Sequence, residues 1–374
     1  MADNLGKQLW LDSIDIGSEF VAVSGVFNDG NFFNYLNEQQ EIEYVEPNQI
    51  YKAAVVLPQE KWQWNDKPTW TQQLVRSGKS LYKRAVSKVA SPNWGLARLN
   101  QRENGHLEEY SFDEEAGAGI HVFVLDTGVH VEHADFENRA VVSANMVAHE
   151  DDTDFGGHGT HVAGKVAGKV YGVAKAASIH AVKILDKAGD GTTSNLIKGI
   201  SHVIQVAPRG KSLINLSLSG PKSRMIDEVL SKAVKEFNIP IFVSAGNAGS
   251  DACYFSPSSN GDVFAVGATD INDEVPFYSD IGPCVRLYAP GSDIKSTWIG
   301  GLDETKTLDG TSMANPHVAG IAATLMSRKN YATASELYND LTALATKDIL
   351  AFRSTRPDMP KSNNLMAYNA VGNE

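Results

Sequence analysis

The feature that most constrains the fold of this chain is a regular alternation, from Ile120 onward, of short apolar runs with segments of helical spacing. Each run is only four to seven residues long, which suits a buried strand better than a buried helix. Strands buried on both faces are typical of parallel sheets, whose crossover connections are usually helices. The sequence therefore predicts an α/β fold with a three-layer, doubly wound, mainly parallel sheet. The predicted strands are Ile120–Leu125, Ile179–Leu185, Leu213–Leu218, Ile241–Ser244 and Val263–Val266, and the predicted helices include Thr193–Gln205, Met225–Phe237 and Thr311–Ser327.

Composition and charge exclude two function classes. The chain has 374 residues, 42% of them hydrophobic, which is enough for a large core and for two domains. A net charge of −12 argues against nucleic acid as a partner, because neutralising phosphates requires a basic surface. No apolar run approaches the roughly 18 residues that span a bilayer, so no membrane span is predicted.

Ser312 is the first candidate for a chemical role. It lies in the run Asp309-Gly-Thr-Ser-Met-Ala-Asn-Pro-His-Val-Ala-Gly320, among small residues at the start of an apolar helical pattern. Alone, such a serine is typical of a helix N-cap. As a nucleophile it would need a histidine base and a carboxylate that orients the base, because a serine hydroxyl is weak at its own pKa.

Candidates for both partners lie upstream. Asp126 ends the first apolar run, and His158 lies in the run Gly156-Gly-His-Gly-Thr-His-Val-Ala-Gly164. An aspartate at a strand end is ordinarily a turn former, but the carboxyl ends of strands are also where ligands bind in doubly wound sheets. Glycines on both sides of His158 indicate a close approach of two backbones rather than a simply packed histidine. The candidate residues therefore occur in the order Asp, His, Ser.

A metal site is the alternative for the histidines. His161 lies one helical turn after His158, and His130 and His133 lie near Asp135. No third ligand at a recognised zinc spacing accompanies either pair, so no catalytic metal is predicted.

Together, the three motifs resemble those of the subtilisin-like serine proteases (peptidase S8), whose triad has the same chain order. The resemblance runs from about Ser91 to about Arg328, and the runs Trp94-Gly-Leu-Ala-Arg98 and Tyr288-Ala-Pro-Gly291 are most similar to the proteinase K and fungal vacuolar protease B (cerevisin) branch. The resemblance implies a subtilisin-like fold and a monomeric serine endopeptidase that acts on polypeptides.

The mechanism that the resemblance implies assigns a role to each residue. Ser312 attacks the peptide carbonyl and forms an acyl-enzyme, His158 moves the proton, and Asp126 orients the imidazole. Asn247, in Ser244-Ala-Gly-Asn247, matches the oxyanion asparagine of the family, and the backbone N–H of Ser312 would be the second donor. An asparagine among glycines is otherwise typical of a turn.

The resemblance also implies a groove for an extended substrate. Its first specificity pocket would be roomy and would favour large apolar residues before the cleaved bond. Ser219 departs from the family, which usually has glycine there, and a side chain at this position could narrow the groove. The implied substrate-binding residues are Ser217, Leu218, Ser219, Gly220, Ser244, Ala245, Gly246 and Tyr254.

The N-terminal part is predicted to be separate from the catalytic domain. The strand Phe20–Phe27, a helix near Asn31–Gln39 and the run Ile42–Lys52 resemble the second half of an inhibitory propeptide, whose usual first strand and helix are not recognisable. The predicted domains are a partial propeptide at 1–53, a linker at 54–90 and the catalytic domain at 91–374. The propeptide would inhibit the enzyme intramolecularly.

The linker is basic, with seven lysines or arginines against two acids between Ala54 and Ala90. It is either a solvated linker or a segment that docks on the acidic catalytic domain. Within it, Lys83-Arg84 is a possible processing site. Met1-Ala-Asp-Asn-Leu5 has neither the positive n-region nor the apolar h-region of a secretory signal. Although relatives in this branch are secreted or vacuolar, the compartment of this chain stays open.

Two further expectations concern Cys253, Cys284 and Arg286. The setting of the two cysteines resembles a cysteine pair of protease B-like proteins, so one bridge is plausible, and two free thiols are the alternative. Arg286 stands where proteinase K-like relatives have an aspartate that helps to bind calcium. A guanidinium has no acceptor and stays charged, so the family-type calcium site is expected to be absent and no cofactor is predicted.

The competing function from another class is a pseudo-protease that binds polypeptides without cleaving them. An intact set of Asp126, His158, Ser312 and Asn247 argues against it, because a binding module needs none of the four together.

Overall fold

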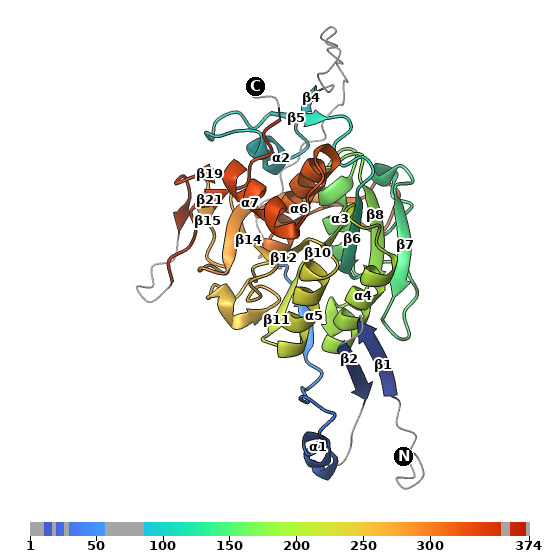
Figure 1. Cartoon of the computed structure of the whole chain (residues 1–374). Coiled ribbons are helices and arrows are strands. Elements are labelled where there is room, and N and C mark those ends of the chain that lie inside the picture. The colour runs from blue at the N-terminus through green and yellow to red at the C-terminus, as the bar shows by residue number, and fades with distance from the viewer. Residues whose placement is uncertain (1–10, 17–19, 26–29, 57–85, 353–359, 372–374) are drawn as a thin grey trace.

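The computed structural model describes residues 11–16, 20–25, 30–56, 86–352 and 360–371. Its centre is a sheet of nine strands in the order β19-β21-β16-β14-β12-β10-β6-β8-β7 (Figure 1). Every neighbouring pair in it is parallel except β19 and β21. The strands are β6 (His121–Asp126), β7 (Ala140–Asn145), β8 (Ser178–Lys183), β10 (Ser212–Leu216), β12 (Ile241–Ser244), β14 (Phe264–Thr269), β16 (Val285–Pro290), β19 (Thr346–Lys347) and β21 (Leu365–Met366).

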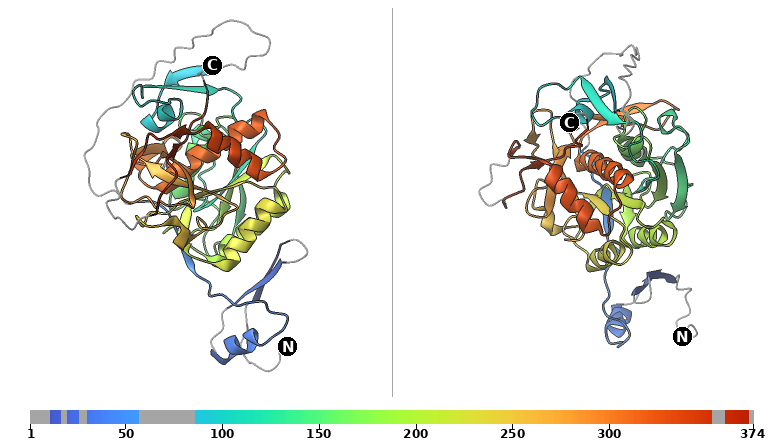
Figure 2. Two further views of the ribbon diagram at one scale, coloured as in Figure 1. Left: turned by 60° about the vertical axis from the view of Figure 1, so that its left-hand side comes forward. Right: turned by 45° about the horizontal axis from the view of Figure 1, so that its top comes forward.

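Helices complete the layers (Figures 1 and 2). The helices α3 (His158–Ala167) and α6 (Thr311–Arg328) pack against each other and against the central strands, while α4 (Thr193–Val206) and α5 (Arg224–Lys235) form a second packed pair. Side-chain caps begin two of them, because Thr192 accepts from the N–H of Asn195 and Ser223 accepts from the N–H of Ile226. The remaining helices are α1 (Gly30–Asn37), α2 (Trp94–Leu99) and α7 (Ala334–Leu344), with short 3₁₀ turns η1 (Ala134–Phe136) and η2 (Ala252–Tyr254).

The predicted α/β class is confirmed, and so are all three predicted helices, to within two residues at either end. Four of the five predicted strands match β6, β8, β12 and β14. Strands β10 and β14 are buried at every position, which explains why their sequences are continuous apolar runs.

The expected strand Leu213–Leu218 was wrong as a single element. β10 ends at Leu216, and β11 (Leu218–Pro221) leaves the main sheet for a smaller one with the order β13-β11-β3-β9. The break occurs at Ser217, whose carbonyl accepts from the hydroxyl of Ser312 and from the N–H of Ala54, and whose hydroxyl donates to the carbonyl of Ser312. The partners of β11 are β3 (Ile50–Ala53) and β13 (Phe255–Ser256), and β9 (Asp190–Thr192) pairs with β3.

The first elements of the chain, before β3, lie at one end of the molecule (Figure 2), where β1 (Leu11–Ile16) packs against α4. β2 (Phe20–Gly25) and α1 match the predicted strand and helix, although Val26 and Phe27 lie outside the described residues. The sequence did not predict β1, which pairs with β2 in antiparallel fashion. The predicted processing site Lys83-Arg84 also lies outside the described residues.

The other strands are short and peripheral: β4 (Val86–Ala90) with β5 (Glu109–Asp113), β15 (Glu274–Val275) with β20 (Ala351–Phe352), and β17 (Ile294–Thr297) with β18 (Thr305–Leu308). Among the residues that the structure describes, no helix is long and apolar enough to cross a membrane.

Candidate active site

Asp126 is the last residue of β6 and is completely buried. Its Oδ1 accepts from the N–H of Thr127 at 2.7 Å and lies 2.7 Å from Nδ1 of His158. A carboxylate can only accept, so this contact favours the tautomer whose proton is on Nδ1 and whose Nε2 has a free lone pair. This Nε2 is buried and has no hydrogen-bond partner among the described residues. The pair therefore presents a histidine base in this tautomer.

The glycines around His158 are required by close contacts. Gly157 has a φ of +84°, and a Cβ there would lie 2.5 Å from the ring of Trp298. A Cβ at Gly159 would lie 2.0 Å from the carbonyl oxygen of Gly128 and 3.0 Å from Cβ of Asp126. The predicted close approach of two backbones is thus present, and it lets α3 begin directly beside the end of β6.

Asp154 organises this junction and was not predicted from the sequence. It is buried, and its Oδ1 accepts from the hydroxyl of Thr127 and from the N–H groups of Gly156 and Gly157. Its Oδ2 accepts from the N–H and the hydroxyl of Thr160. The carboxylate therefore fixes the first turn of α3 to the residue that follows Asp126. A sequence signal was available, because an aspartate before a helix start is typical of a cap.

Ser312 is the second residue of α6 and is completely buried. Its Oγ donates to the carbonyl of Ser217 at 2.8 Å, so the link from serine to histidine is not formed in this state. The proline of the same motif, Pro316, has no N–H to donate to the carbonyl of Ser312 four residues before it, and the hydroxyl of Ser217 donates there instead, at 3.2 Å. Ser217 thus contacts Ser312 through both its carbonyl and its hydroxyl.

Asn247 is held with its amide N–H₂ group free. Its Oδ1 accepts from the N–H of Thr311 at 3.0 Å and from the hydroxyl of Thr311 at 2.8 Å. Its Nδ2 is buried without a partner among the described residues and lies 3.1 Å from where a Cβ at Gly310 would be. Thr311, which the sequence analysis did not single out, therefore turns a hydrogen-bond donor toward the start of α6.

A segment of the chain itself occupies the groove beside Ser312. Strand β3 lies between β11 and β9, antiparallel to both, in the register Leu218 with Ala53 and Ser219 with Lys52. The N–H of Ala54 donates to the carbonyl of Ser217 at 3.1 Å, and the N–H of Ser312 donates to the carbonyl of Ala54 at 3.2 Å. The peptide bond between Ala54 and Val55 consequently lies at the candidate nucleophile.

The side chains of this segment distinguish two positions. Tyr51 is 1% exposed, and its hydroxyl donates to the carbonyl of Pro221 at 2.7 Å. Its ring lies 2.5 Å from where a Cβ at Gly220 would be, so this pocket exists because residue 220 is glycine. Lys52 instead points outward and forms an exposed salt bridge with Asp190.

The other predicted wall of the groove lies next to Asn247. Ser244 donates from its hydroxyl to the carbonyl of Leu218 at 3.0 Å, and Ala245 is completely buried. A Cβ at Gly246 would lie 3.1 Å from Oγ of Ser219, so the two predicted walls face each other. Tyr254 is 68% exposed, so its side chain lies on the surface, and its part in substrate binding stays a prediction.

The histidine pairs outside the triad have other contacts. His133 and His161 each contact backbone carbonyls through Nε2, the former that of Glu304 and the latter those of Ile294 and Lys306. Burial lowers the pKa of His161 to about 3, so the ring is neutral.

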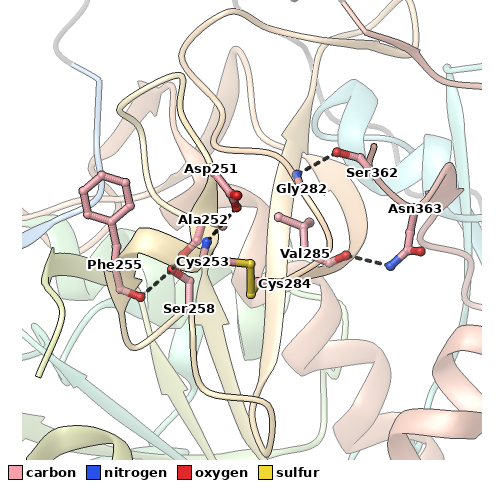
Figure 3. Close-up of a disulfide and its surroundings, with 10 residues drawn as sticks. All are labelled: Asp251, Ala252, Cys253, Phe255, Ser258, Gly282, Cys284, Val285, Ser362 and Asn363. Carbon is pink, nitrogen blue, oxygen red and sulfur yellow. Dashed lines mark hydrogen bonds between the residues drawn. A yellow bond between two sulfur atoms is a disulfide. The ribbon is translucent and has the colours of Figure 1, made fainter. Parts of the chain in front are cut away.

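Cys253 and Cys284 form a disulfide that joins the turn η2 to the segment before β16 (Figure 3). The disulfide therefore links the part of the chain that follows Asn247 to the segment directly before β16. Two residues further, Nη2 of Arg286 donates to the carbonyl of Gly261 at 2.5 Å. The guanidinium therefore points at backbone oxygen, the type of ligand that a calcium ion would need.

The comparisons with known proteins identify the family of this chain. A model of the subtilase family matches residues 117–366. The chain is 38% identical to subtilisin-like protease 8 of Arthroderma otae over 310 residues, which cover 78% of this chain but 63% of that protein. It is 39% identical to cerevisin of Saccharomyces cerevisiae, with 76% of this chain and 48% of cerevisin covered. The chain thus spans less than two thirds of the length of these curated relatives.

Among solved structures, the crystal structure of a cold adapted subtilisin-like serine proteinase is similar, with a TM-score of 0.69 and 37% identity. The match covers 75% of this chain and 99% of that one.

Proposed function

This chain belongs to the subtilase family, and on that premise we propose that it is a serine endopeptidase whose triad is Asp126, His158 and Ser312. The observation that carries the proposal is the position of a peptide carbonyl. The oxygen of Ala54 accepts from the N–H of Ser312, in a segment paired as a strand with β11. Backbone pairing of this kind holds an extended polypeptide whatever its side chains.

The reaction follows from the roles of these groups. Oγ of Ser312 leaves the carbonyl of Ser217, attacks the substrate carbonyl carbon and gives its proton to Nε2 of His158. The oxyanion accepts from the N–H of Ser312 and from Nδ2 of Asn247. The carbon–nitrogen bond then breaks as His158 returns the proton to the leaving amine, and an acyl-enzyme remains. Water attacks the ester with His158 again as base, which releases the carboxylic acid and restores Ser312.

The same groove supports a broad specificity. Its walls are largely backbone and small side chains, and the proposed preference is for large apolar residues before the cleaved bond. The hydroxyl of Ser219 faces Gly246 across this pocket, which limits how large that residue can be. Alanine stands there in the chain's own segment. Initial rates on peptides that differ only at this position, with alanine, leucine or phenylalanine, compare the proposed preference for large apolar residues with the size limit that Ser219 sets.

We also propose that residues 1–53 act as an intramolecular inhibitor. Support comes from contacts on both sides of the groove. The carboxylate of Glu46 accepts from the N–H of Met225 at the start of α5, and Oδ1 of Asn48 accepts from the N–H of Ser194 at the start of α4. Acidic and polar acceptors at helix N-termini are favourable because those N–H groups have no partners within the helix.

The bond proposed for self-cleavage is Ala54–Val55, rather than one in the Lys83-Arg84 region. N-terminal sequencing of the purified chain should give Val55 as the first new terminus, and the Ser312→Ala variant should stay intact. A first cleavage after Arg84, or cleavage in Ser312→Ala without any added protease, would contradict this assignment.

A third proposal concerns calcium. The residues at the family's site do not fit a cation, because the guanidinium of Arg286 already donates to the carbonyl of Gly261. Burial acts to raise the pKa of the nearby Asp262 carboxyl, but Lys235 and Ser231, helped by the positive charge of Arg286, lower this pKa below its usual value. We propose that Arg286 takes the place of the ion, so that this part of the structure is independent of calcium.

The decisive experiment for the proposed activity is peptide hydrolysis with product masses. The parent chain should cleave an unstructured polypeptide at internal bonds, and Ser312→Ala should lose this activity. Ser327→Ala is the matched control, because Ser327 lies in the same helix and its hydroxyl is hydrogen-bonded to the carbonyl of Thr324 and the N–H of Gly117, away from the triad. If the parent chain binds the polypeptide without cleaving it, the protein is instead a pseudo-protease that binds polypeptides.

A further inference from the structure

A buried carboxylate lies beneath the loop that carries Asn247. Asp280 is completely buried, and its Oδ1 accepts from the N–H of Ala248 at 3.0 Å and from the N–H of Ser250 at 2.7 Å. The N–H of Asp280 itself donates to the carbonyl of Gly246 at 2.9 Å. These three hydrogen bonds fix the backbone on both sides of Asn247.

The second carboxylate oxygen has no such role. Oδ2 of Asp280 is buried without a hydrogen-bond partner among the described residues, and it lies 2.2 Å from where a Cβ at Gly246 would be. Gly246 has a φ of +112°, so a side chain there would be strained and would also displace the carboxylate. Among the described residues, the titratable groups that interact electrostatically with Asp280 are Asp251 and Tyr288, and neither is a cation. Burial of a carboxylate without a cation is costly, which suggests a specific role for the group.

Asn247 is therefore held from two directions. Thr311 fixes its side-chain oxygen, and Asp280 fixes the backbone from which the side chain projects. Among the described residues, no hydrogen bond joins the side chains of Asn247 and Asp280, so any effect of Asp280 on the reaction would pass through the loop. The donor must lie within about 2.7–3.1 Å of the developing oxyanion, so a small shift of this backbone would remove the hydrogen bond from the transition state.

We propose that Asp280 is a positioning residue that aligns Nδ2 of Asn247 with the oxyanion through the backbone from Gly246 to Ser250. The proposal rests on the proposed endopeptidase activity. Oδ1 of Asp280 accepts both hydrogen bonds, so alignment requires a planar side chain with an oxygen at the place of Oδ1. The negative charge of the carboxylate is not required for alignment.

The test is a double-mutant cycle on the full chain after self-cleavage, with folded sites counted by titration with a fluorophosphonate. Asn247→Ala alone should lower kcat by about 10²–10³, the loss known for removal of such a donor in subtilisin. Asp280→Ala should lower kcat at least about tenfold with KM nearly unchanged, because the lost interaction is made mainly in the transition state. In the Asn247→Ala background, Asp280→Ala should cost less than about threefold, because residues that act through one another are not additive.

Two variants separate alignment from general stability. Asp280→Asn keeps an oxygen that can accept both N–H groups and should restore most of kcat. Ser258→Ala removes the hydrogen bonds that this hydroxyl donates to the carbonyls of Ala252 and Phe255, outside the Gly246–Ser250 backbone, and should leave kcat unchanged (Figure 3). If Asp280→Ala does not fold, Asp280→Ser, whose hydroxyl is too short to accept both bonds, takes its place in the cycle.

Equal losses from Asp280→Ala with and without Asn247 would overturn the proposal, and so would an Asp280→Asn variant as slow as Asp280→Ala. Failure of the proposed function is distinguishable, because the parent chain itself would then not hydrolyse peptides and Ser312→Ala would match it.

Discussion

Replacing Asp280 with asparagine should remove a specific pH dependence from the stability of this protein. Burial raises the pKa of the Asp280 carboxyl from 3.8 to about 7, and the hydrogen bonds from Ser250 and Ala248 only partly oppose this. The folded state therefore binds this proton more tightly than the unfolded state does. Between about pH 4 and pH 7 the folded chain holds more protons, so the free energy of unfolding falls as the pH rises.

The size of the effect follows from the two pKa values. One pKa unit corresponds to about 1.4 kcal/mol, so the full contribution is at most about 4 kcal/mol, complete below pH 4 and lost above pH 7. From pH 5 to pH 8 the parent should lose about 2–3 kcal/mol through this group alone. An amide does not titrate, so Asp280→Asn should lack this part of the slope, while every other group contributes equally to both proteins.

Denaturant unfolding at pH 5, 6, 7 and 8 measures the difference. Both proteins should carry Ser312→Ala, so that self-digestion does not interfere, and two-state behaviour should be checked with two probes. The parent and the Asp280→Asn variant should diverge as the pH falls from 8 to 5, with the parent gaining stability relative to the variant. Parallel curves, or a parent that gains stability as the pH rises relative to the variant, would refute the reasoning.

Three further predictions address the triad, the groove and the calcium site. Ser312→Ala, His158→Ala and the double variant should lose similar activity, because residues that act as one unit are non-additive; multiplied losses in the double variant would argue against a shared proton path. A free peptide of residues 43–54 should inhibit the mature enzyme competitively. Tyr51→Phe in this peptide should weaken inhibition about 2- to 10-fold through one lost hydrogen bond, whereas Lys52→Ala, at an exposed position, should weaken it less. A larger loss from Lys52→Ala than from Tyr51→Phe would be inconsistent with the buried tyrosine pocket. Thermal melts of the parent should be the same in calcium and in chelator, and Arg286→Asp should gain a calcium-dependent rise; a large rise in the parent that Arg286→Asp leaves unchanged would point to another calcium site.

The sequence predicted those parts of the fold that depend on local patterns. The buried parallel strands β6, β8, β12 and β14 and the buried helix α6 are apolar over most of their length, so their residue ranges were close to correct. The strand break at Ser217 could not be predicted in this way, because the residues on both sides are apolar. It depends on a contact with Ser312, which is 95 positions away in the chain.

Site residues that lie in a sequence motif could be predicted. Residues whose role depends on a contact with a part of the chain that is distant in sequence could not. His158 and Asp126 stood out by their glycines and by the strand end, and their side chains are in contact. Thr311 acts through a contact with Asn247 that only the folded chain creates, whereas Asp154 carried a local signal, its place before a helix start, that was not used. Asp280 is like Thr311 in this respect, because an aspartate in a loop gives no sign of its burial.

The sequence also did not predict which residues of β3 pair with which residues of the groove. The segment was recognised as part of a propeptide, but a strand's register depends on both partners. The pairing of Ser219 with Lys52 brings Ala54 to Ser312, whereas a slip by one residue would turn Tyr51 away from its pocket.

The central claim, that Ser312 is a nucleophile activated by His158 and Asp126, is tested most directly by covalent labelling. The mature chain is treated with a fluorophosphonate, and the modified residue is located by peptide mass. We expect one adduct, on Ser312, no adduct in Ser312→Ala, and labelling slowed by several orders of magnitude in His158→Ala although that protein remains folded. Labelling of another serine, or labelling of Ser312 at the same rate without His158, would contradict the account.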